Sequence, residues 1–147
     1  MSYRKEKITD NLAYILAQAH RNVHQMLEKQ LRLEGMQVEN WRILDVLSDE
    51  KGRSMGELAE IVLMNHPALT KMLDKMVARG LVHRSLDPRD QRKVIVFITN
   101  VGLEVHQKLN EHAVKFNQRF HSNIGPKKLQ ELKELLNEII DETTPLQ

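Results

Sequence analysis

The chain has 147 residues, of which 41% are hydrophobic and 29% charged, and its formal net charge at pH 7 is +2. These values are typical of one ordinary globular domain with enough apolar residues for a sizeable core. The chain has no cysteine, which excludes disulfides and thiolate chemistry. It also has no apolar segment of the kind found in secretory signal peptides and no apolar run of about 18 residues, the length of a membrane span. We therefore expect a cytoplasmic protein with no membrane partner.

Two helices are predicted in the N-terminal third of the chain. Apolar residues recur with a helical period from Ile8 onward, and Gly35 marks the end of this pattern, so the first helix is expected over residues 8–35. A second, shorter helix is predicted over residues 38–47, which include Trp41. It ends before the polar stretch SDEKGR.

Two further helices, joined by a tight turn, are predicted between residues 54 and 80. Ser54, followed three residues later by Glu57, matches a capping box that opens the first of them. Asn65 has the N-cap residue type for the second helix, Pro67 suits its first turn, and Gly80 ends it. Helical periodicity predicts inward positions at Leu58, Ile61, Leu69, Met72, Leu73, Met76 and Val77, and an outward recognition face of His66, Ala68, Thr70, Lys71, Asp74 and Lys75.

A β-hairpin is predicted directly after these helices. Its strands are Val82 to Leu86 and Lys93 to Thr99, the second being rich in valine, isoleucine and phenylalanine. Asp87, Pro88 and Asp90 supply turn chemistry, and Arg89, Arg92 and Lys93 lie at or beside the tip. A helix-turn-helix followed by a basic hairpin predicts a winged helix whose wing enters a narrow minor groove of DNA.

The charge distribution supports this interpretation. Residues 65–93 contain seven Lys/Arg and three Asp/Glu, whereas residues 127–142 contain three and five. A basic segment within a nearly neutral chain is the expected electrostatic footprint of a small DNA-binding module. For any single residue, a merely solvated charged surface remains the alternative.

Residues 100–143 are predicted to form long helices interrupted at Gly125 and Pro126. The apolar stripes of this segment and of residues 8–35 lack an obvious partner within one small chain. Pairing with a second copy would cover them, and a twofold homodimer would match a palindromic site in double-stranded DNA.

The sequence resembles the MarR family of bacterial winged-helix regulators over nearly its full length and in the order of its elements, and two segments carry the resemblance. The more specific is DPRDQRKVIVFITNVG at residues 87–102, which is similar to the family's wing signature, and GELAEIVLMNHPALTKMLDKMVARGLVHR at residues 56–84 extends it. The resemblance implies a mainly α fold with a small β-hairpin wing (α+β): a single domain over residues 1–147, with a winged helix-turn-helix at 38–99 and dimerisation helices at 8–35 and 100–143. It also implies a homodimeric repressor that releases DNA when a small ligand binds.

The same resemblance assigns roles to individual residues. Arg92 resembles the wing arginine that enters the minor groove, Asp90 its partner in the turn, and Lys71 the best candidate for a base contact. The full set of expected DNA-binding residues is Ser54, His66, Pro67, Ala68, Thr70, Lys71, Lys75, Arg84, Arg89, Arg92 and Lys93.

Two ligand hypotheses concern the N-terminal helices. Tyr14, Arg21 and Trp41 could offer an aromatic wall and a cation to an effector such as an aromatic carboxylate, a phenolic compound or its coenzyme A thioester. No other cofactor is expected. His20 and His24 lie one helical turn apart, a spacing that can chelate zinc, although a solvated or core-edge pair is the favoured interpretation because tetrahedral zinc needs further ligands.

The sequence contains no HExxH, GxSxG or phosphate-cradling glycine motif, so we expect no enzyme. The alternative to a DNA-binding regulator is a winged-helix adaptor that binds another protein without specific DNA binding.

Overall fold

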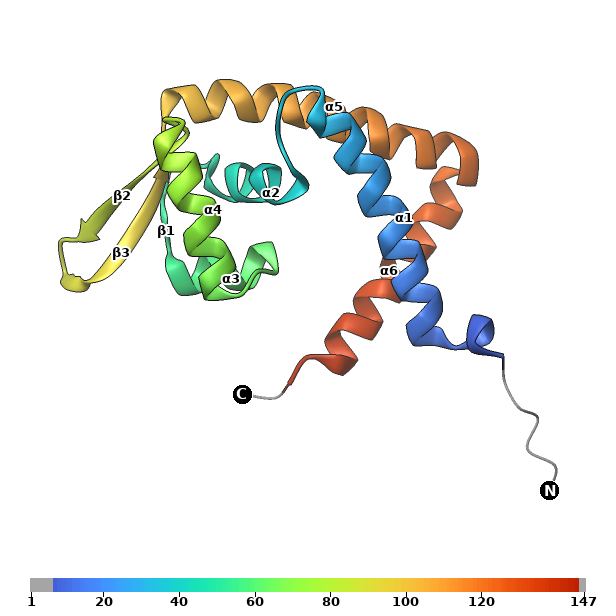
Figure 1. Ribbon diagram of the computed structural model, residues 1–147. Helices are drawn as coiled ribbons and strands as arrows, with labels where there is room; N and C mark the ends of the chain where they lie inside the picture. The colour runs from blue at the N-terminus through green and yellow to red at the C-terminus, as the bar shows by residue number, and fades with distance from the viewer. Residues whose placement is uncertain (1–6, 146–147) are drawn as a thin grey trace. The chain divides into compact units, whose positions relative to one another are not determined.

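The computed structural model describes residues 7–145 and divides into two compact units, the first ending at Asn110 and the second beginning at Glu111. The first unit contains η1 (Ile8–Asp10), α1 (Leu12–Arg32), α2 (Val38–Leu47), β1 (Arg53–Ser54), α3 (Met55–Val62), α4 (His66–Ala78), β2 (Val82–Asp87) and β3 (Asp90–Ile98) (Figure 1). Helix α5 (Asn100–Ile124) begins in the first unit and ends in the second, where α6 (Pro126–Thr143) follows. This mainly helical fold with a small antiparallel sheet confirms the predicted fold class.

Helix α1 starts later than predicted. Residues 8–10 form the short 3₁₀ helix η1, and the backbone of Asn11 is extended. The side chain of Asn11 accepts a hydrogen bond from the backbone N–H of Tyr14 at 3.2 Å, so Asn11 caps α1. The predicted start at Ile8 is therefore wrong, because a side-chain cap interrupts the periodic pattern.

The cap residues of the helix-turn-helix lie where the sequence predicts them. The Ser54 hydroxyl accepts a hydrogen bond from the Glu57 backbone N–H at 3.2 Å, and Asn65 Oδ1 accepts one from the Ala68 backbone N–H at 2.8 Å. These contacts fix the first turns of α3 and α4. Helix α4 ends at Ala78, just before Gly80, and both helices are confirmed.

The buried faces of these two helices differ from the prediction at two positions. Helix α3 buries Leu58, Ala59 and Val62, which places Ile61 on its flank with 53% of its surface exposed. Helix α4 buries Leu69, Leu73 and Met76, so Val77 lies outside the core. The predicted inward positions of Ile61 and Val77 are wrong, because the buried face of each helix is centred about one residue away from the face that the periodicity predicted.

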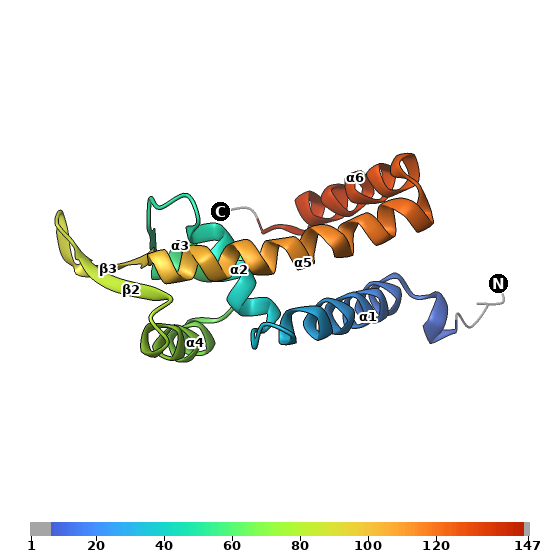
Figure 2. The same cartoon turned by 90° about the horizontal axis from the view of Figure 1, so that it is seen from above.

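The three strands form one antiparallel sheet in the order β1-β3-β2. Strands β2 and β3 pair from Val82↔Ile98 to Leu86↔Val94, and the pair Asp87↔Asp90 closes the hairpin after a shift in register. Strand β3 thus begins at Asp90, three residues before the predicted start, because only residues 88–89 form the turn. Figures 1 and 2 show this hairpin, the wing, extending beyond α3 and α4.

Thr99 and Gly102 join the wing to α5. The Thr99 hydroxyl donates to the carbonyl oxygen of Gly80 at 2.6 Å and accepts from the backbone N–H of Gly102 at 3.0 Å. A Cβ atom at position 102 would overlap the carbonyl oxygen of Leu81 and the side chain of Ile98. Only glycine therefore allows the start of α5 to approach the base of the hairpin this closely.

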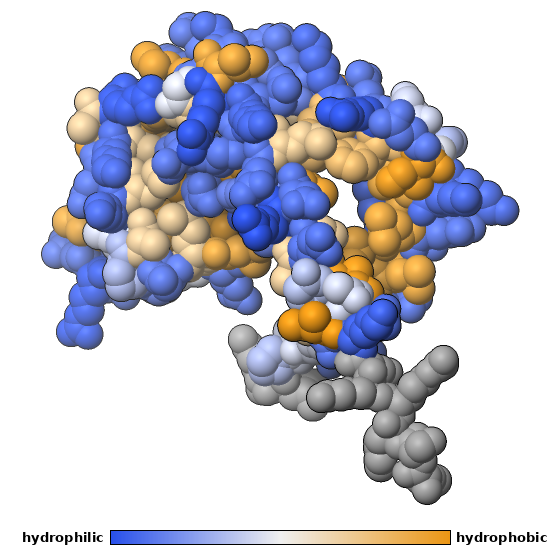
Figure 3. Space-filling view, turned by 45° about the vertical axis from the view of Figure 1, so that its right-hand side comes forward, coloured by the Kyte–Doolittle hydropathy of each residue, from blue (hydrophilic) through white to orange (hydrophobic). Residues whose placement is uncertain are grey.

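The second unit consists of the C-terminal part of α5 and helix α6, separated at Gly125 as predicted. Helix α6 exposes Leu132, Leu135 and Ile140, and in the first unit α1 exposes Leu12, Ile15 and Val23. The space-filling view in Figure 3 shows hydrophobic residues at the surface among the hydrophilic ones. Within the described part of the chain, no helix has the length and apolar character needed to span a membrane.

Candidate nucleic-acid interface and adjoining pockets

The exposed face of α4 carries most of the predicted recognition residues. Because Leu69, Leu73 and Met76 face the core, the opposite side of the helix is open to solvent. His66, Pro67, Ala68, Thr70, Lys71 and Lys75 are all exposed there. A helix that presents its N-terminal residues and two lysines on one open face has the geometry of a major-groove reader.

The wing exposes two guanidinium groups near its tip. Asp87 Oδ1 accepts a hydrogen bond from the Arg89 backbone N–H at 2.9 Å, and Asp90 Oδ1 accepts one from the Arg92 backbone N–H at 3.0 Å. Each aspartate thus shapes the backbone, and Asp90 contacts Arg92 through the main chain. Neither the Arg89 nor the Arg92 guanidinium has an ion-pair partner among residues 7–145.

Arg84 and Ser54 differ from the other predicted DNA contacts, because their side chains already have partners within the protein. The Arg84 guanidinium lies 2.6 Å from Asp74 Oδ1 and 3.4 Å from the carbonyl oxygen of Thr70. The Ser54 hydroxyl, besides capping α3, donates to Glu57 Oε1 at 2.9 Å. Lys93 is exposed on β3 without such a contact in the described chain.

The sequence reasoning missed strand β1 and the ion pair between its first residue, Arg53, and Asp49. Arg53 donates to both carboxylate oxygens of Asp49, at 3.2 and 2.7 Å. The side-chain hydrogen bond from Arg53 and the backbone N–H of Lys51 lower the pKa of Asp49 from 3.8 to about 2. The D-x-x-x-R spacing within SDEKGR was the available signal.

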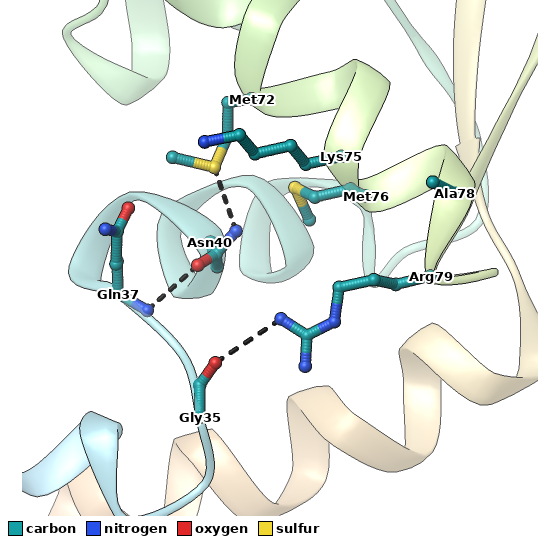
Figure 4. A pocket seen from close by; sticks show the side chains of 8 residues that line it. All are labelled: Gly35, Gln37, Asn40, Met72, Lys75, Met76, Ala78 and Arg79. Atoms are coloured by element: carbon teal, nitrogen blue, oxygen red, sulfur yellow. Dashed lines mark hydrogen bonds between the residues drawn. The ribbon is translucent and has the colours of Figure 1, made fainter.

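A cavity of about 430 Å³ lies between α2 and α4 (Figure 4). The buried Asn40 donates from Nδ2 to Met72 Sδ at 3.0 Å, and Arg79 donates to the carbonyl oxygen of Gly35 at 3.3 Å. Gln37 and Lys75 complete its polar lining. The cavity therefore has α4 on one side and, on the other, α2 with the residues that directly precede it.

A second cavity, of about 600 Å³, shares Gln37, Met72 and Lys75 with the first. His24, Glu28 and Glu39 lie in its lining, as do Ala68 and Lys71 of α4. The predicted pair His20 and His24 has ring centroids 5.5 Å apart, but His20 is exposed whereas His24 is half-buried. The structure thus groups His24 with two glutamates, one of which comes from α2.

The predicted effector residues Tyr14, Arg21 and Trp41 do not line either of these two cavities. Tyr14 and Trp41 are half-buried and Arg21 is exposed. Trp41 Nε1 is buried and has no hydrogen-bond partner among the described residues. Their role in binding an effector stays a prediction.

Comparison with known proteins gives a consistent result. A family model described as "MarR family" matches residues 34–93. The chain is 29% identical to the HTH-type transcriptional repressor IacR of Pseudomonas putida, covering 91% of this chain and 78% of the relative. It is 25% identical to the homoprotocatechuate degradative operon repressor of Escherichia coli, over 89% and 88%. Among solved structures, the repressor CouR bound to a 23-mer DNA duplex matches with a TM-score of 0.84 at 22% identity, covering 95% of this chain and 99% of that one.

Proposed function

The chain belongs to the MarR family and is a DNA-binding transcriptional regulator, and from this premise we propose that it represses as a homodimer, with α4 in the major groove and Arg89 and Arg92 in the minor groove. The twofold symmetry of such a dimer would match a palindromic operator. Two recognition helices would then enter successive major grooves about 34–36 Å apart. A protein of this type acts on chromosomal DNA in the cytoplasm.

The observation that carries this proposal is the pair of exposed wing guanidiniums next to an open, lysine-bearing helix face. Arg89 and Arg92 have no ion-pair partner among the described residues, although Asp87 and Asp90 lie beside them. The aspartates are oriented by backbone hydrogen bonds, which leaves both guanidiniums available to phosphate or to the minor groove. An arrangement that fixes the backbone of the tip and exposes its cations supports DNA binding over a protein-binding adaptor.

Exposed apolar residues support the homodimer. Leu12 and Ile15 on α1 and Leu135 and Ile140 on α6 are 47–59% exposed. Large apolar side chains gathered on helical faces mark interaction surfaces in a protein of this size. A second copy of the same chain would bury them through a self-complementary contact.

The two cavities beside α4 support control by a small effector. Both are lined by Lys75 and Met72 of the recognition helix, and the first is also lined by Arg79. Cationic and thioether groups suit an aromatic acid, a phenol or a related thioester. The Escherichia coli relative is named for an operon that degrades homoprotocatechuate, which is itself an aromatic acid. An effector that binds the DNA-free dimer more tightly would shift the population away from the operator-bound state.

A binding experiment tests the proposal. Fluorescence anisotropy would measure the affinity of the purified chain for duplexes tiled across the DNA adjoining its own gene, with scrambled duplexes of equal length and composition as controls. We expect one duplex to bind at least about a thousandfold more tightly than its scrambled form. Equal affinity for all duplexes would contradict sequence-specific regulation and would favour the adaptor.

A further inference from the structure

We infer that His24, Glu28 and Glu39 form a binding site for a divalent transition-metal ion of the zinc type. His24 and Glu28 are one turn apart on α1, and Glu39 lies in the first turn of α2. One ligand atom from each side chain lies within 4.8 Å of the other two. One imidazole and two carboxylates are a ligand set that zinc and its first-row neighbours accept.

The distances favour a shared ion over direct hydrogen bonds. His24 Nε2 lies 3.7 Å from Glu28 Oε2 and 3.7 Å from Glu39 Oε1. A direct N–H···O bond would require about 2.7–3.2 Å. Two ligands bound to zinc at about 2.0–2.1 Å with a tetrahedral angle lie roughly 3.3–3.4 Å apart. The two separations from His24 are thus too long for direct hydrogen bonds, and each exceeds the spacing of two zinc ligands by only a few tenths of an ångström.

The hydrogen bonding of His24 points the same way. Its Nδ1 is buried without a hydrogen-bond partner among the described residues, and its Nε2 faces the two carboxylates at non-bonding distance. Of the two ring nitrogens, only Nδ1 is a buried unsatisfied atom, and an ion bound at Nε2 would not reach it, so the observation that bears on the site is that Nε2 makes no direct hydrogen bond to either carboxylate. An ion at Nε2 would satisfy that nitrogen.

Capping of α2 explains only one of the two carboxylates. Glu28 Oε2 accepts a hydrogen bond from the Val38 backbone N–H at 3.0 Å, which holds this carboxylate at the start of α2. Glu39 makes no comparable contact in the part of the chain that the structure describes, and it points its carboxylate at the same imidazole. The Val38 contact would act as the outer hydrogen bond that orients a metal-binding carboxylate.

The surroundings set the expected strength of the site. Arg42, Lys71 and Lys75 line the same cavity and oppose a further positive charge. Three protein ligands also leave at least one coordination position for water or for an anion. We therefore expect binding weaker than that of closed structural zinc sites.

Zinc binding to the full-length, metal-free protein tests the inference. Competition with a chromogenic zinc indicator would give stoichiometry and affinity, and Co²⁺ absorption would report the coordination geometry. We expect one zinc ion per chain, with His24→Gln and Glu39→Gln each weakening binding at least about tenfold. His20→Gln, which changes the exposed neighbouring histidine, and Glu60→Gln on the surface of α3 are matched controls that should bind as the parent does.

Circular dichroism of each variant would confirm that it is folded. The site would be overturned if the protein bound no zinc, or if His24→Gln and Glu39→Gln left zinc binding unchanged. The assay contains no DNA, so this outcome would be independent of the proposed regulatory function.

Discussion

The guanidinium of Arg84 on β2 lies 2.6 Å from the carboxylate of Asp74 on α4, and this ion pair ties the wing to the recognition helix. The same guanidinium is 3.4 Å from the carbonyl oxygen of Thr70. Both contacts come from the base of the hairpin. The position of the wing relative to α4, on which the proposed contact with two grooves depends, is therefore held partly by this pair.

We expect Arg84→Gln to act mainly on the coupling between the wing and α4. A double-mutant cycle with Asp74→Asn, measured by urea unfolding, should give a coupling energy of about 0.2–1 kcal/mol, because both side chains are partly solvated. Arg84→Gln should reduce DNA affinity less than Arg92→Gln does. An equal loss of affinity in the two variants, with no coupling to Asp74, would instead make Arg84 a direct DNA contact.

Gly102→Ala should destabilise the protein by about 1–3 kcal/mol, because the added methyl group overlaps the backbone of Leu81. Gly56→Ala is the matched control, since Gly56 lies within α3 and a Cβ there meets nothing within 4 Å. That change should stabilise by roughly 0.5–1 kcal/mol through helix propensity. Thermal unfolding followed by circular dichroism measures both, and equal melting temperatures for the two variants would refute the close approach at position 102.

Asp49 should titrate with a midpoint of about 2, as its hydrogen bonds to Arg53 and Lys51 indicate. Because the pKa in the folded state lies below the ordinary value of 3.8, the ion pair stabilises the fold above that pH, and this contribution is lost as the pH falls toward 2. Carboxyl carbon NMR would give the midpoint directly. In Arg53→Gln the midpoint should rise toward 3.8, and a midpoint that stays low would assign the shift to another group.

Leu135→Glu on α6 should weaken self-association, because it places a charge on an apolar surface proposed to be buried between two copies. Leu33→Glu is the control: Leu33 is 73% exposed, just after α1 ends, so this change should leave association intact. Sedimentation equilibrium would show a dimer for the parent and the control and a larger monomer fraction for Leu135→Glu. A monomeric parent protein would contradict the homodimer.

Local signals predicted much of the fold. Asn65, Pro67 and Gly80 act within one or two turns of their own position, so their effect on α4 could be predicted without knowledge of the tertiary structure. The basic tip of the wing was likewise predictable, because Asp87 and Asp90 shape the turn through hydrogen bonds two residues along the chain.

Long-range contacts account for the parts that were missed. Strand β1 has two residues and exists only because Arg53 pairs with Val96, which is distant in the sequence. Glu39 joins His24 because the chain reverses between α1 and α2, and no helical spacing links residues on different helices. The cavities beside α4 depend in the same way on the packing of α2 against the recognition helix.

The salt dependence of DNA binding in Arg92→Gln tests the central claim most directly. For the parent protein, the logarithm of the binding constant should fall steeply with the logarithm of salt concentration, and Arg92→Gln should reduce that slope by about 0.9 for each phosphate that the wing no longer neutralises. The variant should also bind DNA more weakly by about 1–3 kcal/mol, whereas Lys127→Gln, an exposed lysine on α6, should behave as the parent does. If Arg92→Gln leaves both the slope and the affinity unchanged, the wing does not contact DNA and the proposed mode of binding is wrong.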